Sequence, residues 1–186
     1  MTLSGADSDP SRIEIAGLVM PKPVTWIWQK PTMQFRTLQY AVPAPGGSSP
    51  DAELIFSLFP AGDGGPIEPN IERWANQFRV EGGGGAKPEN RTTRQIDGMR
   101  ATRLDLRGAY MGMGAAAPRP NMAQLGAIIE SPDATVFIRL LGPEATVETA
   151  RKDFEALVDG MKRANAAAPA APAAPAAPAA PAPPAK

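Results

Sequence analysis

The chain of 186 residues contains no histidine and no cysteine. Histidine is the side chain that most readily exchanges protons near neutral pH, and it is the commonest metal ligand. Cysteine supplies thiolate nucleophiles, disulfides and many zinc ligands. Their joint absence excludes Ser-His-Asp and Cys-His catalytic triads, Cys/His metal centres and thiol redox chemistry. The chemistry that remains open is that of carboxylate, lysine or tyrosine side chains.

The sequence also lacks a charge excess and a long apolar run. Basic and acidic residues balance at 19 each, which gives a formal net charge of zero. Nucleic-acid-binding proteins usually carry a basic excess, because phosphate contacts supply much of their affinity. No apolar run reaches the roughly 20 residues that a membrane-spanning helix needs. We therefore expect no nucleic-acid partner and no membrane span.

The two ends of the chain are predicted to be disordered. Residues 166–186 are alanine and proline up to a final lysine, mostly as an Ala-Ala-Pro repeat. Proline at every third position blocks a helix and favours an extended, polyproline-II-like chain. This tail is interpreted as a spacer, a ligand for a proline-recognising groove, or a disordered segment without a specific partner. Residues 1–10 are also predicted to be disordered.

The start of the chain bears on localisation. Residues 1–7 lack the basic and apolar regions of a secretory signal peptide. A cytoplasmic location is therefore expected for the sequence as written. A periplasmic or envelope-associated location is expected if a leader was removed or misannotated.

Residues 11–165 are predicted to form a single domain that contains two amphipathic helices. Apolar residues recur at three- and four-residue intervals in 69–80 and again in 147–163. Thr146 is the expected N-cap of the second helix, because its hydroxyl would accept a hydrogen bond from an unpaired backbone N–H. Each helix must bury its apolar stripe against another element.

The rest of the domain is predicted to be strand. The predicted strands are 13–19, 25–29, 33–41, 53–59, 90–96, 99–106, 124–130 and 135–141. The strand at 53–59 is too apolar for an edge and is expected in mid-sheet. Short turns such as Asp97-Gly98 imply antiparallel pairing. We therefore expect an α+β fold, in which an antiparallel sheet of about six to seven strands is covered by the two helices.

Five runs in this core carry a resemblance to a known family. They are Ala52–Phe56, Asn70–Phe78, Asp105–Tyr110, Leu125–Glu130 and Leu141–Pro143. Together they resemble a widespread family of uncharacterised bacterial proteins, many of them exported or lipid-anchored. The resemblance implies a PsbP-like fold, an α/β/α sandwich named for an extrinsic subunit of photosystem II and also found in a nuclear Ran-release factor. It implies no catalytic residue and no cofactor, because the family has no assigned activity.

The stretch 110–122 is predicted to be an unusually long loop between two strands. Its methionines have flexible side chains that adapt to an apolar partner surface. The loop is interpreted either as a mobile lip over a shallow binding groove or as a disordered connection. The candidate partner-binding residues from this stretch are Tyr110, Met111, Met113 and Arg119.

Arginines cluster around the predicted hairpin, at positions 91, 94, 100, 103 and 107. The Asp97-Gly98 turn would place Arg94 and Arg103 on one face of the hairpin, and Arg91 and Arg100 on the other. The cluster is interpreted as a site for an anionic surface or as a solvated sheet face. The candidate partner contacts from it are Arg103 and Arg107.

Trp26 and Trp28 alternate with Ile27, so in a strand both indoles would lie on one side. They are interpreted as an aromatic platform for a ligand or as core residues. Trp28 is retained as a candidate partner contact.

These features predict a non-catalytic binding or assembly module, whose partner is a protein or an envelope component. No catalytic, cofactor or metal site is predicted. An alternative function, an apolar-ligand or lipid carrier, requires a cavity between sheet and helix lined by residues such as Trp26, Trp74 and Phe78. A second alternative, a small carboxylate-dependent hydrolase, requires a cleft with two facing acidic residues, at least one with a raised pKa.

Overall fold

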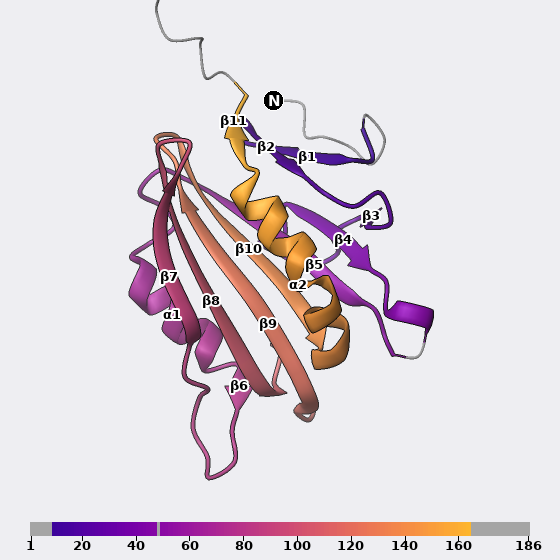
Figure 1. Ribbon diagram of the computed structural model, residues 1–186. Helices are drawn as coiled ribbons and strands as arrows, with labels where there is room; N and C mark the ends of the chain where they lie inside the picture. The colour runs from indigo at the N-terminus through magenta and orange to yellow at the C-terminus, as the bar shows by residue number, and fades with distance from the viewer. Residues whose placement is uncertain (1–8, 48, 165–186) are drawn as a thin grey trace, which may run out of the picture.

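A computed structural model describes residues 9–47 and 49–164 of the chain. These residues form layers of helix and sheet. A large antiparallel sheet has one helix on each face, and a small sheet lies beside the second helix (Figure 1). The predicted Ala/Pro tail and most of the predicted disordered N-terminus lie outside the described residues. Within that N-terminal segment, Asp9 accepts hydrogen bonds from Ser11.

The large sheet has eight strands within the described part of the chain, in the order β3-β4-β5-β10-β9-β8-β6, and β7 pairs with β8. All their pairings are antiparallel, as the short turns predict. Because β5 lies between β4 and β10, the expected mid-sheet strand is confirmed. The strands are β3 Ile27–Gln29, β4 Leu38–Val42, β5 Ala52–Pro60, β6 Phe78–Arg79, β7 Glu89–Ile96, β8 Met99–Tyr110, β9 Arg119–Glu130 and β10 Ala134–Pro143.

The predicted turn at Asp97-Gly98 sets the register of the β7–β8 hairpin. Asp97 and Gly98 have φ values of 48° and 76°, the left-handed conformations that a type I′ turn requires. The turn places Ile96 opposite Met99 and Thr92 opposite Arg103. The hairpin therefore has the predicted register over most of its length.

The first predicted strand, 13–19, is wrong, because this segment is a hairpin. Strands β1 (Arg12–Ile15) and β2 (Leu18–Pro21) pair across Ala16-Gly17, whose positive φ values of 49° and 74° reverse the chain. A third strand, β11 (Lys162–Arg163), pairs with β2 and completes the small sheet. The predicted C-terminal end of the second helix is therefore extended chain, because it pairs with β2.

Both helices are shorter than predicted. They are α1 (Ile67–Ala75) and α2 (Glu144–Asp159), and a 3₁₀ turn lies at Pro45–Gly47. Thr146 is inside α2 rather than at its N-cap, and its hydroxyl donates to the carbonyl of Pro50 at 3.0 Å. Within the described residues, neither helix has the length and apolar character needed to cross a membrane.

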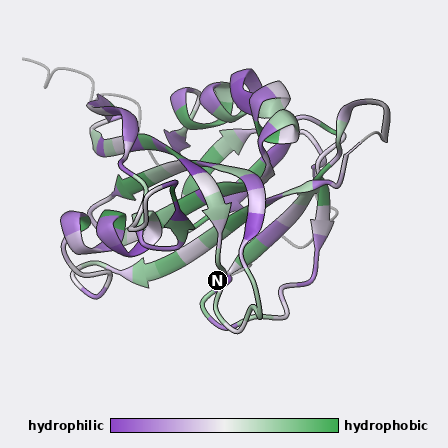
Figure 2. Ribbon diagram, turned by 90° about the horizontal axis from the view of Figure 1, so that it is seen from below, coloured by the Kyte–Doolittle hydropathy of each residue, from purple (hydrophilic) through white to green (hydrophobic). Residues whose placement is uncertain are grey.

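Two separate apolar cores lie on opposite faces of the large sheet. Successive side chains of a strand point to opposite faces, so Ile138 packs with Phe154 of α2, whereas Phe137 packs with Trp74 of α1. The strands accordingly are hydrophobic along much of their length, and both helices alternate hydrophobic and hydrophilic faces (Figure 2). The sheet is therefore buried on both sides, which defines the sandwich.

This division into two cores excludes the single cavity that the carrier alternative requires. Trp26 belongs to the core on the α2 side, and Trp74 and Phe78 belong to the core on the α1 side. All three are buried side chains within packed clusters. They therefore do not line one cavity, and that form of the carrier hypothesis is wrong.

Gly126 in β9 gives the Trp74 indole the space to pack closely against the sheet. A Cβ at position 126 would lie 2.8 Å from Cζ3 of the indole. We expect Gly126→Ala to lower the free energy of unfolding by about 1–3 kcal/mol, because overpacking a filled core forces its neighbours to shift. Urea denaturation measures the loss. In a Trp74→Leu background the same substitution is expected to cost less, and equal costs in the two backgrounds would contradict the assignment.

Candidate functional site

The arginines of the β7–β8 hairpin are bound to acidic residues on both faces of the sheet. On the α2 side, Arg94 and Arg103 both approach Asp159 at the end of α2, at 3.0 and 3.4 Å. On the α1 side, Arg91 pairs with Glu68 of α1. The predicted separation of the cluster into two faces is confirmed, and these side chains tie the hairpin to the two helices.

Arg107 has more carboxylate partners than the other hairpin arginines on the α2 side. It pairs with Glu144 in the first turn of α2 and with Glu148 one turn later, where the Nη2–Oε1 distance is 2.6 Å. Its Nε also lies 3.7 Å from a carboxylate oxygen of Glu89. Three carboxylates therefore surround Arg107, and the guanidinium faces the protein's own acidic groups.

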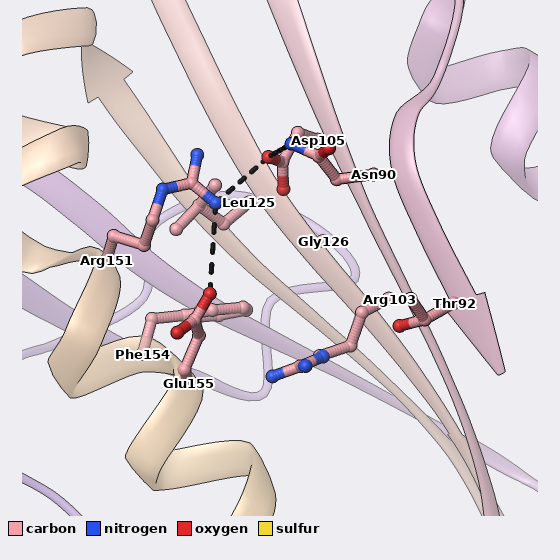
Figure 3. A pocket seen from close by; sticks show the side chains of 9 residues that line it. All are labelled: Asn90, Thr92, Arg103, Asp105, Leu125, Gly126, Arg151, Phe154 and Glu155. Atoms are coloured by element: carbon pink, nitrogen blue, oxygen red, sulfur yellow. Dashed lines mark hydrogen bonds and ion pairs between the residues drawn. The ribbon is translucent and has the colours of Figure 1, made fainter. Parts of the chain in front are cut away.

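A polar pocket of about 200 Å³ lies between α2 and strands β7–β9 (Figure 3). At its centre Arg151 lies between two carboxylates, with Nη1 at 2.9 Å from Asp105 and 4.0 Å from Glu155. Asn90 also donates a hydrogen bond to Asp105 at 2.8 Å. A hydrolase would need its two acidic groups to face each other across a cleft, whereas here both face a guanidinium. The pocket therefore holds an internal ion-pair network.

A larger groove, of about 390 Å³, opens on the α1 side of the sheet. We call it the Arg139 groove. Its walls come from the segment Met33–Arg36, strand β5, helix α1 and the residues around Tyr110 and Met113, and Arg139 of β10 also lines it. The groove exists because the core on this side draws its residues mainly from strands β8 to β10 and only Phe59 from β5. Helix α1 thus leaves the β5 side of the sheet uncovered.

Arg139 is held by neutral groups. Its Nε donates to Oε1 of Gln124 and its Nη2 donates to Oε1 of Gln77, each at 2.7 Å. The guanidinium also lies 5.4 Å from the centre of the Trp74 ring. Within residues 9–47 and 49–164, no carboxylate forms an ion pair with it, and burial lowers the pKa of Arg139. The arginine is therefore a cation fixed in position without an acidic partner.

The other polar and charged groups around the groove have different partners. Arg36 binds Gln39 at 2.7 Å and Glu53 at 3.2 Å, and Arg73 donates to Asn70 at 2.6 Å. Gln124 is fully buried, and its Nε2 has no hydrogen-bond partner among the described residues. The cluster around Arg139 thus contains a second polar group whose hydrogen-bonding capacity is unused.

Apolar side chains stand exposed at the mouth of the groove. Phe35 is 68% exposed, Met33 is 47% exposed, and Met113 is 80% exposed. Phe35 stacks on Phe59, with ring centres 6.4 Å apart, so an apolar surface runs from the mouth into the groove. This combination of exposed apolar rim and cationic floor is suited to binding an amphipathic anion.

The structure brings some of the predicted contact residues together and separates the others. Tyr110 and Met113 line the Arg139 groove, and Met111 follows Tyr110 in the chain. The Cζ atom of Arg119 lies 5.7 Å from the centre of the Tyr110 ring. The remaining three, Arg103, Arg107 and Trp28, belong to the opposite side of the sheet. The seven residues therefore do not form one surface.

The predicted loop 110–122 is shorter in the structure, because the strands on either side extend into it. Strand β8 ends at Tyr110 and β9 begins at Arg119. Met122 consequently lies in β9 and is buried, whereas Met113 is on the connection itself and is exposed. The two tryptophans interpreted as an aromatic platform or as core residues both belong to the α2 side. Trp26 is a core residue, and Trp28 is partly buried against the same core.

Arg139 and its two glutamine partners were not among the predicted site residues. The sequence does carry a signal for the arginine, because it is the one charged residue in the apolar run Val136–Leu141. Its hydrogen bonds with Gln77 and Gln124 depend on how α1 and β9 pack, which no local pattern in the sequence indicates. Within the described residues, no group of three or more acidic side chains is placed to hold a metal ion.

No family model and no curated protein matches the chain. Among solved structures, the solution structure of cyanobacterial PsbP from Synechocystis sp. PCC 6803 matches with a TM-score of 0.55 and 14% identity, over 84% of this chain and 95% of that one. The protein has a PsbP-like fold. This confirms the fold that the sequence resemblance implies.

A second solved structure belongs to PA94, a protein of unknown function from Pseudomonas aeruginosa. It matches with a TM-score of 0.49 and 17% identity, over 72% of this chain and 94% of that one. At such identities the likeness concerns the PsbP-like fold alone. A functional assignment therefore has to come from the site.

The link between Glu148 and its arginines makes stability depend on acid pH. Hydrogen bonding to Arg151, and the charges of Arg151 and Arg107, hold the pKa of Glu148 below its ordinary value of 4.5. The stabilisation is therefore complete above that value, and it is lost as the pH falls through the lowered pKa. We expect Glu148→Gln to lower the free energy of unfolding at neutral pH by less than about 1 kcal/mol, since the group is partly exposed.

As the pH is lowered from neutrality to below the lowered pKa, the variant and the native protein are expected to approach equal stability, because Glu148 is then protonated in the folded as well as in the unfolded state. Urea denaturation at the two pH values measures the difference. A deficit of the variant that stays constant between them would contradict the assignment.

Proposed function

We propose that the protein is a non-catalytic binding or assembly module, which contacts a protein partner through the Arg139 groove and its apolar rim. The observation that supports this most directly is the position of Phe35 and Met113. Both are largely exposed at the mouth of a groove whose floor carries an arginine without an acidic partner. Exposed apolar groups around a polar anchor are typical of sites that another protein covers.

The arrangement of acidic groups favours binding over catalysis. The buried carboxylate of Asp105 is bonded to Arg151 and Asn90, so its hydrogen-bonding capacity is used within the fold. In the Arg139 groove the lining consists of apolar, amide, hydroxyl and guanidinium side chains, without a carboxylate. Such a lining can hold and orient an anion, and it offers no general base of the aspartate or glutamate type.

A protein partner explains the rim better than a free small ligand does. A small molecule within about 390 Å³ would occupy the groove and still leave the outer parts of Phe35 and Met113 in water. A partner with a surface larger than the groove would cover both side chains. Their burial would then contribute to affinity in proportion to the apolar area removed from water.

Site-specific photo-crosslinking tests this proposal in the native organism. Benzoylphenylalanine placed at position 35 or 113 is expected to capture the same protein. At Lys152, which is exposed on α2 at the opposite side of the sheet, the same group is expected not to capture it. Capture at Lys152 alone, or different proteins at positions 35 and 113, would contradict the proposal.

Phe35→Ser and Met113→Ser provide a second test on the captured protein. We expect the double variant to lower its affinity about tenfold or more, because truncating an interface hot spot costs about 2 kcal/mol. Thermal unfolding should change little, since both side chains are largely exposed. Unchanged affinity in isothermal titration, with the fold intact, would exclude this rim as the contact.

A further inference from the structure

The lining of the Arg139 groove has a marked charge imbalance. Three arginines, Arg36, Arg73 and Arg139, line it together with apolar and neutral polar groups; Arg36 is paired with Glu53, which is outside the lining, and no carboxylate lines the groove itself. The whole chain carries a formal net charge of zero, so this local excess is not a consequence of overall composition. An anionic group entering the groove would therefore be attracted to it.

Of these three arginines, Arg139 has the geometry of an anchor. Two of its five N–H donors are bonded to the side-chain amides of Gln77 and Gln124, its Cζ lies 5.4 Å from the centre of the Trp74 ring, and the Tyr110 side chain is a further hydrogen-bond partner. These contacts hold the planar guanidinium in one orientation before any ligand arrives. A fixed guanidinium loses little entropy when it binds, and its fork matches the two oxygens of a carboxylate.

The surroundings of Arg139 also explain why a carboxylate would be held there. A cation removed from water is costly unless an opposite charge or sufficient hydrogen bonds compensate it. Here the compensation comes from two amides, the side chain of Tyr110 and an aromatic ring, none of which is an acidic group, and Gln124 keeps an unpaired, buried Nε2 next to them. A carboxylate would supply the missing negative charge in a setting where water screens it weakly.

The apolar walls restrict which carboxylate fits. Phe59 and Trp74 each pack edge-to-face against Phe137, with ring centres 5.5 and 5.9 Å apart, and Ile55 lines the β5 side. Above them, the exposed Phe35 and Met113 extend the apolar surface to the mouth. A ligand that satisfies both the floor and the walls has a carboxylate with apolar groups on either side of it.

We propose that the Arg139 groove binds an acidic side chain flanked by apolar residues in a segment of the protein partner. This specificity rests on the proposed function, and it names the chemistry that the partner presents. Arg139 binds the carboxylate, and the aromatic walls and rim bind the flanking apolar side chains.

The test compares two blocked peptides that differ in one charge. They are acetyl-Phe-Leu-Glu-Leu-Phe-amide and its counterpart with glutamine in place of glutamate. In ¹H–¹⁵N NMR titrations of the full chain, the glutamate peptide is expected to bind about tenfold more tightly or better, since hydrogen bonds to charged groups are the stronger ones. The shifted resonances are expected to include the indole of Trp74. Equal affinity for the two peptides would overturn the proposal.

Variants separate Arg139 from the other arginines. Arg139→Met is expected to abolish the preference for glutamate, whereas Arg94→Met, which removes an arginine paired with Asp159 on the opposite side, is expected to retain it. Circular dichroism checks that both variants fold. If the Met variant does not fold, Arg139→Lys, which keeps the charge without the planar fork, is expected to weaken the preference. An undiminished preference in a folded Arg139 variant would overturn the assignment.

The other candidate occupant of the groove is a free amphipathic acid. Decanoate serves as the probe for this alternative. Decanoate that binds at Arg139 while the glutamate peptide does not would overturn the choice of a peptide segment. The result of the crosslinking experiment does not depend on the result of the peptide titration. Capture of a protein at positions 35 and 113, together with equal peptide affinities, would leave the binding function and reject the carboxylate specificity.

Discussion

The alternation of side chains along strands β9 and β10 is the constraint on which the rest of the structure depends. Each strand sends successive residues to opposite faces, and both faces are apolar, as Ile138 and Phe137 illustrate. Such a sheet cannot have a solvated side, so one helix has to cover each face. The small sheet, the hairpin ion pairs and the position of both helices follow from this requirement. The PsbP-like sandwich is the way in which this chain meets it.

The Arg139 groove arises where that covering is incomplete. Helix α1 is short and ends at Ala75, so it covers the β8–β10 part of its face, and residues of β5 beside it line the groove. On the other face, the longer α2 and the small sheet complete the core, and the polar pocket between α2 and strands β7–β9 is occupied by the Arg151 network. The asymmetry between the two helices therefore places the Arg139 groove on the α1 side.

Charge is used differently in the Arg151 network and in the Arg139 groove. On the α2 side, Arg107 and Arg151 are matched by acidic residues of α2 and its neighbours, and these links join helix to sheet. On the α1 side, Arg139 is matched by amides and an aromatic ring. The first pattern stabilises the fold, and the second retains capacity for a ligand. Counting arginines along the hairpin therefore pointed to arginines that are already paired with acidic residues.

Local pattern in the sequence was sufficient for the antiparallel pairing, the mid-sheet position of β5, the Asp97-Gly98 turn and the two amphipathic helices, because periodicity and turn chemistry act over a few residues. It was insufficient at Ala16-Gly17, where the apolar alternation continues across a tight turn and resembles one strand. Tertiary structure alone decided that Tyr110 and Met113 meet Arg139 whereas Arg103 and Arg107 lie on the other face. The physical reason is that strand pairing and helix coverage bring together residues far apart in sequence, and no local pattern records which of them share a face.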